Sequence, residues 1–391
     1  MDNLTHSLVG LAASKAGLER LSPQATAVCI LASNAPDSDI LALLVGGRWA
    51  FLQHHRGITH SLIGTLVLAL LIPLIFYLAD RLVARIRSRR PSIKLRGLML
   101  ATLIVSATHP FMDWTNNYGI RLLLPWNSRW FYGDLVFIVD PFLWLIFGAA
   151  AFLLTSKTRK QILLWLVPAL LVTYVVFFGP AARGRLTNPS LLRGLWITAL
   201  IGIVILSRLN VAQRWGGKLA IAAFAVMVLY WGGLAIVHTM AIRQARLEAS
   251  VVASEAGEKV DQIVAMPTLA NPFHWQCVLE TERAVYRFEL FLIGGRRGPS
   301  GLVRYQKPDA STAHAVALAS GDARARIFLG FARFPVVRVV TSDCATQTLV
   351  QFADLRYTEP GRAAGIFSLE VPIESPHQSA ARDQQMQEIS K

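Results

Sequence analysis

The sequence is poor in cysteine, in charge and in acidic residues. Its 391 residues include three cysteines, 24 acidic against 39 basic side chains and only 16% charged residues, whereas 53% are hydrophobic. So few cysteines exclude a small disulfide-built fold, and so little charge is atypical of an ordinary soluble domain. The predicted fold class is a polytopic α-helical membrane domain followed by a C-terminal α+β, mostly β, soluble domain.

Signatures of several enzyme classes are also missing. The sequence has no glycine-rich phosphate-binding loop, no nucleophile elbow and no His-Glu-x-x-His motif, so nucleotide-binding, serine-hydrolase and zinc-protease signatures are excluded. It shows no internal repeat, although many transporters contain paired inverted repeats. The first residues, Met1-Asp2-Asn3, lack a basic region, so no signal peptide is expected.

Long apolar runs occupy the first 242 residues. Ser61–Ala79 and Ile162–Ala182 contain no charged residue, and each is long enough to cross a bilayer as a helix. Ala25–Gly47 is apolar but is interrupted by Asn34-Ala35-Pro36-Asp37, which predicts a re-entrant or split helix. Further membrane helices are predicted at Gly97–Thr108 (if extended through His109), Leu135–Thr155, Leu191–Ser207 and Leu219–Ile242.

The basic residues are unevenly distributed. Residues 1–240 hold 22 of the 39 basic residues but only 8 of the 24 acidic ones. Arg81–Arg96 is the densest basic cluster, and the positive-inside rule predicts a cytoplasmic loop there rather than a nucleic-acid groove. We therefore expect no nucleic-acid partner, and we predict a multi-pass protein of a bacterial inner membrane with its C-terminal domain in the periplasm.

A change of composition near residue 243 marks a second domain. Residues 1–242 are predicted to form the helical membrane domain, 243–266 a connector helix, 267–374 a β-rich extracytoplasmic domain and 375–391 a disordered tail. Cys277 and Cys344 fall in the β-rich domain, where a periplasmic location permits a disulfide, with two separate thiols as the alternative. The predicted strands are His274–Glu282, Ala284–Leu292, Arg326–Val340, Thr346–Asp354 and Gly365–Ile373, with a short helix at Ala313–Ala319.

Histidine and aspartate gather in short groups inside or beside the apolar runs. An ionised carboxylate in an apolar segment is costly unless something compensates it, and a bound cation would do so. Imidazole together with carboxylate suits zinc, manganese or iron. The groups are Thr5-His6-Ser7, Pro36-Asp37-Ser38-Asp39, His54-His55-Arg56-Gly57-Ile58-Thr59-His60-Ser61 and His109-Pro110-Phe111-Met112-Asp113.

Two of these groups also have a simpler interpretation. Asp37 or Asp39 could cap a helix that begins at Ile40, which accounts for one carboxylate more easily than for two. His109 and Asp113 are four residues apart and share a helix face, so a hydrogen bond between them is the alternative to joint metal binding.

These motifs, followed by Tyr118-Gly119, resemble the signature of the bacterial YdjM/YbcI-like family, inner-membrane proteins described as metal-dependent hydrolases. Three C-terminal motifs, Phe273-His274-Trp275, Phe331-Ala332-Arg333-Phe334-Pro335 and Asp354-Leu355-Arg356-Tyr357, resemble longer members. More distantly, the family is grouped with zinc-dependent phospholipase C and P1-type nucleases. The His109-x-x-x-Asp113 spacing is similar to theirs, but the sequence lacks their His-x-x-x-Glu motif, which puts a full three-zinc site in doubt.

The resemblance implies metal-assisted hydrolysis by one to three divalent ions, zinc before manganese or iron. Arg56 is the candidate to bind a phosphate through its planar guanidinium. Asp140 is a candidate catalytic residue, either as a ligand or by orienting a histidine. The candidate metal ligands are His6, Asp37, Asp39, His55, His60, His109 and Asp113.

Three classes of function follow. The first is a membrane phosphoesterase that acts on a lipid or a small phosphate ester near the outer face, with membrane lipids as its partners. The second is a transport or metal-handling protein, against which the missing inverted repeats argue. The third is a structural membrane protein with a vestigial site, against which the complete set of ligand groups argues.

Overall fold

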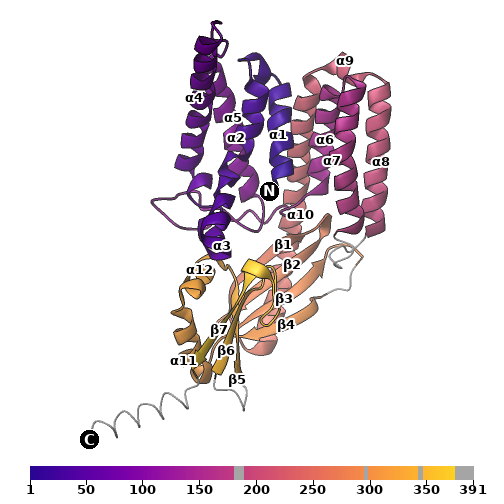
Figure 1. Cartoon of the computed structure of the whole chain (residues 1–391). Coiled ribbons are helices and arrows are strands. Elements are labelled where there is room, and N and C mark those ends of the chain that lie inside the picture. The colour runs from indigo at the N-terminus through magenta and orange to yellow at the C-terminus, as the bar shows by residue number, and fades with distance from the viewer. Residues whose placement is uncertain (180–188, 295–297, 342–346, 375–391) are drawn as a thin grey trace, which may run out of the picture. The chain divides into compact units, whose positions relative to one another are not determined.

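The computed structural model describes residues 1–179, 189–294, 298–341 and 347–374 (Figure 1). The chain divides into two compact units. The first comprises Met1–Asp39, Arg56–Ala241 and Met266–Trp275, and the second comprises Ile40–His55, Ile242–Ala265 and the chain from Gln276 onward.

Helices make up most of the first unit. Short 3-10 turns at Leu18–Arg20, Ala35–Ile40 and Ile58–His60 connect some of them. The last helix, α10, runs from the first unit into the second. The helices are α1 (Asn3–Lys15), α2 (Ala25–Asn34), α4 (Leu62–Ile86), α5 (Leu95–Trp114), α6 (Pro141–Thr155), α7 (Arg159–Phe178), α8 (Pro189–Arg208), α9 (Val211–Trp215) and α10 (Lys218–Ala256).

Within the described ranges, six helical segments are long and apolar enough to cross a membrane. Large apolar side chains on them, such as Leu70 and Leu78 on α4 and Leu170 on α7, are exposed. Rows of exposed leucines are unfavourable in water but suit contact with lipid. The predicted polytopic helical membrane domain is therefore confirmed. The six segments are Ala25–His54, Leu62–Ile86, Leu95–Trp114, Arg159–Phe178, Pro189–Arg208 and Lys218–Ala256.

Two local predictions about these helices are confirmed. The helix predicted from Gly97 continues through His109, because α5 ends only at Trp114. The segment Ala25–Gly47 is broken where expected, since α2 ends at Asn34 and a 3-10 turn follows.

The core of the first unit forms where α1, α5, α6 and α10 meet. Val9, Met112, Leu143 and Phe147 are almost completely buried there, and Trp231 closes the cluster from α10. This packing fixes α1 and α5, the two helices that carry His6 and His109.

The chain after α10 forms two sheets, and most of it belongs to the second unit. The strands β1 (Val260–Thr268), β2 (Asn271–Thr281), β3 (Ala284–Phe291) and β4 (Ser300–Gln306) form one sheet in that order. The strands β5 (Pro335–Thr341), β6 (Gln347–Asp354) and β7 (Ser368–Glu374) form an antiparallel sheet, in which Phe352 of β6 pairs with Val337 and Leu369. The unit also contains α3 (Leu41–His54), α11 (Ala310–Ser320), α12 (Ala323–Phe331) and a 3-10 turn at Gly365–Phe367. The predicted, mostly β C-terminal domain is confirmed.

The structure differs from the sequence-based prediction in three places. The segment 243–266 is not one helix, because Gly257 adopts φ +63° after the end of α10 and β1 begins at Val260. Arg326–Val340 is not one strand, because Asp322 accepts a hydrogen bond from the Arg324 amide and starts α12. The strands β1 and β4 were not predicted.

Some predictions concern residues outside the described ranges. Among the described residues Cys277 forms no disulfide and is buried, and burial raises the pKa of its thiol. Its predicted disulfide partner, Cys344, lies outside the described residues, as do the tail 375–391 and the last residues of the helix predicted at Ile162–Ala182.

Candidate metal centre

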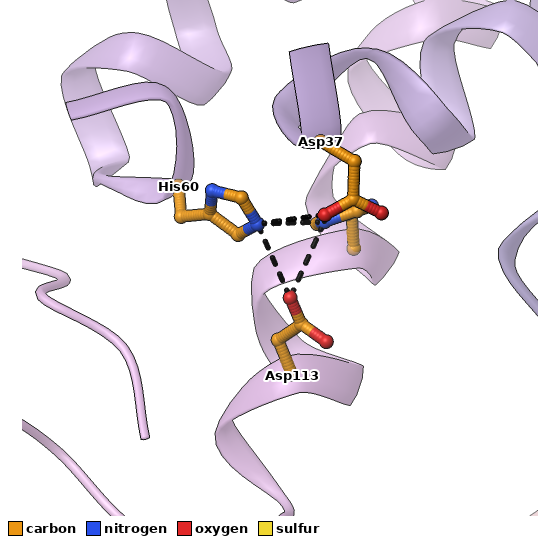
Figure 2. A group of neighbouring side chains, drawn as sticks. Asp37, His60 and Asp113 are labelled. Carbon is orange, nitrogen blue, oxygen red and sulfur yellow. Dashed lines mark hydrogen bonds and ion pairs between the residues drawn. The ribbon is translucent and has the colours of Figure 1, made fainter. Parts of the chain in front are cut away.

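Four of the seven predicted ligands converge at one end of α4 and α5. Figure 2 shows the side chains of Asp37, His60 and Asp113 pointing toward one another. Asp37 lies in the turn after α2, His60 precedes the first residue of α4, and His109 and Asp113 lie near the end of α5. One ligand atom of each residue lies within 4.8 Å of the others. The side chains of the two histidines and Asp113 are fully buried, whereas Asp37 is 12% exposed.

A glycine allows His60 to reach this position. A Cβ atom on Gly64 would lie 1.8 Å from the carbonyl oxygen of Ile58, so only glycine lets α4 begin against the turn that carries His60. The Ser61 hydroxyl accepts a hydrogen bond of 3.1 Å from the Gly64 amide and caps the helix. The local sequence around His60 therefore fixes where its ring can point.

Five of the six distances between the four ligand atoms match the edges of a tetrahedron around one cation. His60 Nε2 lies 3.1 Å from His109 Nε2, 3.3 Å from Asp37 Oδ1 and 3.2 Å from Asp113 Oδ2. His109 Nε2 lies 3.6 Å from Asp37 Oδ1 and 3.3 Å from Asp113 Oδ2. In a tetrahedron the edge is about 1.63 times the distance from centre to corner, so these edges correspond to metal–ligand distances of about 2.0 Å, as zinc forms with nitrogen and oxygen.

The other ring nitrogens set the protonation of the two histidines. His109 Nδ1 lies 2.6 Å from the backbone oxygen of Ser33, which can only accept a hydrogen bond. His60 Nδ1 lies 3.1 Å from Thr59 Oγ1 and 3.3 Å from Asp39 Oδ2, and the Thr59 hydroxyl donates to the same carboxylate. Each Nδ1 atom is therefore placed to donate a hydrogen bond, and each Nε2 atom is the ring nitrogen that faces the centre and can bind a metal.

A bound cation would stabilise this arrangement. Two imidazole Nε2 atoms face each other at 3.1 Å and are bordered by two carboxylates. A cation between them would be attracted to all four groups. The cluster can therefore hold a metal ion, and its donor set suits the metals predicted from the sequence.

Asp39 lies behind His60. Its Oδ2 atom accepts hydrogen bonds from the Arg56 amide at 2.9 Å and from the Thr59 hydroxyl at 3.2 Å, and it faces His60 Nδ1. These contacts orient the His60 ring. A carboxylate that supports a metal-binding histidine usually lies in this position, behind the ring. Direct metal binding by Asp39 stays a prediction.

His6 lies on the far side of His109. Their rings stack with centroids 3.8 Å apart, and His6 Nε2 lies 3.5 Å from Asp113 Oδ1. Within the described part of the chain, neither ring nitrogen of the fully buried His6 has a hydrogen-bond partner. Burial holds the pKa of His6 well below its usual range, so the ring is neutral and has a lone pair to offer. Metal binding by His6 stays a prediction.

Arg56 is held within the site. Its Nη2 atom lies 3.1 Å from Asp113 Oδ1, and its Nη1 atom donates to Asn116 Oδ1 at 2.8 Å and to the Gly119 carbonyl at 3.4 Å. The guanidinium lies over the Tyr118 ring, and the side chain is 3% exposed. The backbone amine of Met1 also contacts Asp113 Oδ1. These contacts favour a role in holding Asp113, and phosphate binding by Arg56 stays a prediction.

The two remaining candidates, Asp140 and His55, are not members of this group of four. Asp140 caps α6 by accepting a hydrogen bond of 2.9 Å from the Phe142 amide, and it accepts another of 2.9 Å from the Tyr230 hydroxyl. His55 follows α3, belongs to the second unit and stacks on Phe51. The predicted catalytic role of Asp140 and the predicted metal binding by His55 therefore stay predictions.

Sequence analysis missed four residues that position the cluster. Asn3 donates a hydrogen bond of 2.9 Å to Asp37 Oδ2, and Asn116 and Thr59 contact Arg56 and Asp39 as described above. These three lie within three residues of a motif histidine or aspartate, which was an available signal. Ser33 acts through its backbone carbonyl, which no pattern of side chains reveals.

Comparison with known proteins supports the family resemblance. Residues 1–186 match the family described as YdjM inner membrane protein. Over 160 residues the chain is 31% identical to the uncharacterized protein YfhP of Bacillus subtilis (strain 168), and the match covers 38% of this chain and 45% of that relative. The chain therefore spans about half the length of this curated relative. No solved structure matches it significantly. The predicted distant similarity to phospholipase C and P1-type nucleases stays a prediction.

Proposed function

We propose that this chain, whose residues 1–186 belong to the YdjM inner membrane protein family, is a membrane-bound metal-dependent hydrolase that cleaves a phosphate ester. The observation that carries the proposal is the group Asp37, His60, His109 and Asp113, whose ligand atoms are spaced for one tetrahedral cation. Zinc is favoured by the nitrogen and oxygen ligands and the short implied distances. Manganese and iron are the alternatives.

A divalent cation bound at such a site supplies a Lewis acid and an activated water for hydrolysis. The side chains and backbone around the site orient the metal ligands. The carbonyl oxygen of Ser33 and the carboxylate of Asp39 hold the two histidine rings, and Arg56 holds the Asp113 carboxylate. Asp37, the partly exposed ligand, marks the side from which a substrate approaches.

The activity test uses the variant Asp37→Asn in the purified full-length protein. Removing the charge of one ligand is expected to lower kcat/KM for phosphate esters by more than about 100-fold. Even the mutation of a residue that only supports a metal ligand typically lowers metal affinity or activity by about 10–100-fold. Asp261→Asn, at an exposed position of β1, is the matched control. The measurement is phosphate release from a panel of mono- and diesters after loading with zinc or manganese.

Two results would contradict the proposal. Metal-loaded wild type that hydrolyses no ester points to the metal-handling alternative. Hydrolysis that is equal in Asp37→Asn and wild type places the activity at another site.

We also propose that the metal centre lies near the outer face of the inner membrane. His60 lies two residues before the start of α4, and Asp113 lies near the end of α5, so both are at the opposite ends of these helices from the basic connection between Ile86 and Leu95. That connection belongs to the Arg81–Arg96 cluster, and the positive-inside rule favours the cytoplasm for it.

A reporter experiment tests this topology. A fusion after Arg90 is expected to be active only as a cytoplasmic reporter, and a fusion after Ser375 only as a periplasmic one, because basic loops resist translocation. Paired alkaline phosphatase and fluorescent protein fusions measure this in intact cells. Finding both positions on one side of the membrane would refute the orientation.

A further inference from the structure

A cavity of about 350 Å³ lies between α1, α6, α7 and α8 of the first unit. Its volume falls within the range of about 300–1,000 Å³ that is typical of ligand sites. Its walls are leucine, isoleucine, valine, alanine, glycine, proline and aromatic residues, with Thr173 as their one hydroxyl. None of these residues belongs to the metal centre.

The polar atoms on the walls already have partners. The indole nitrogen of Trp144 donates to Asp2, that of Trp165 donates to Thr155, and that of Trp196 donates to the hydroxyl of Thr173. A polar ligand would therefore lose its own hydration without gaining hydrogen bonds from these groups. The apolar walls therefore favour a hydrocarbon ligand over a polar one.

The cavity borders the surface that faces lipid. Leu166, Leu170 and Val204 line it and are also exposed on α7 and α8, two helices of membrane-crossing length. A hydrocarbon chain in the bilayer can therefore enter from the side, without passing through water.

The cavity also lies next to the metal centre. Leu4 and Leu8 of α1 line the cavity, and their spacing of four residues places them on one face of the helix. His6 stands midway between them in sequence and therefore points to the opposite face, where it stacks on His109. The thickness of α1, about 10 Å with its side chains, separates the two sites.

We propose that this cavity binds one hydrocarbon chain of a membrane lipid whose phosphate ester lies at the metal centre. The inference rests on the proposed function and narrows its substrate class to lipid-linked phosphate esters. The chain occupies the space between α6, α7 and α8, while the headgroup passes the N-terminal end of α1 to reach Asp37.

The test fills the cavity from one wall. A Cβ atom added at Gly148 on α6 would meet only Leu8, at 4.0 Å, which is ordinary contact, so the side chain of Gly148→Leu extends into the cavity. Ala169→Phe fills it from α7, in case the first variant folds poorly. Gly232→Leu is the matched control, because that position on α10 is exposed and has open space around it.

Binding is measured first, on the full-length protein without added metal. The probe is a long-chain alkyl phosphate with a photoreactive diazirine on its chain, in vesicles of phosphatidylethanolamine and phosphatidylglycerol. We expect labelled peptides from α6, α7 and α8, with labelling at least about tenfold weaker in Gly148→Leu and in Ala169→Phe, since filling an apolar pocket discriminates by about 10–200-fold. Labelling of Gly232→Leu is expected to equal that of wild type.

Hydrolysis is measured second, with the same long-chain phosphate and with p-nitrophenyl phosphate. Filling the cavity is expected to lower kcat/KM for the long-chain ester by about 10–200-fold and to leave the soluble ester unchanged. Equal labelling of the filled variants and wild type would overturn the inference, even if the protein hydrolyses soluble esters. Labelling that follows the cavity in a protein without esterase activity would support the lipid site and overturn the proposed function instead.

Discussion

The variant His60→Ala is expected to lose more than about 100-fold in metal affinity, because removal of a ligand should exceed the 10–100-fold cost of removing a supporting residue. His60 Nε2 lies within 3.3 Å of ligand atoms from His109, Asp37 and Asp113, so its loss opens one corner of the tetrahedron. The measurement is zinc content after dialysis against a buffered free-metal series.

Two further variants provide an intermediate case and a control for this measurement. Asp39→Asn keeps all four ligand atoms but weakens the support of the His60 ring, so a loss of about 10–100-fold is expected. His314→Ala, at an exposed position of α11, should bind metal like wild type. If His60→Ala and wild type hold equal metal under the same conditions, the four-residue centre is wrong.

The second unit is expected to lose about 3–5 kcal/mol of stability when Arg356 is replaced by Met, because a buried carboxylate is then left without its partner. Arg356 Nη2 lies 2.7 Å from Asp354 Oδ2, and both side chains are fully buried. The same nitrogen donates to the carbonyl oxygen of Phe331, so the arginine also joins the end of α12 to the end of β6.

Hydrogen exchange of the amides in β6 measures this free energy in the full-length protein. Arg324→Met is the control, because Arg324 pairs with Asp322 while 44% exposed, and exposed pairs contribute about 0–1 kcal/mol. The double variant Arg356→Met with Asp354→Leu should recover part of the loss, since it removes the unpaired charge. A loss in Arg356→Met no larger than in Arg324→Met would show that the buried pair contributes little.

The sequence by itself determined the properties that depend on neighbours in the chain. Runs such as Ser61–Ala79 are apolar throughout, so length and hydropathy alone identify them as membrane helices. The break after Asn34 follows from Asn34-Ala35-Pro36-Asp37 in an apolar run, and the shared face of His109 and Asp113 follows from their spacing of four. The family resemblance also rested on short motifs, which can be recognised in the sequence without knowledge of the fold.

Only the tertiary structure decided which of the seven candidates meet. The turn after α2, the start of α4 and the end of α5 converge because α2, α4 and α5 pack on one another, and no local pattern encodes contacts between segments so far apart in the sequence. The same packing places Asp39 behind His60 and sets the Ser33 carbonyl against His109. The cavity lined by Leu4 and Leu8 could likewise not be predicted from the sequence, since the spacing of these residues predicts only an apolar helix face.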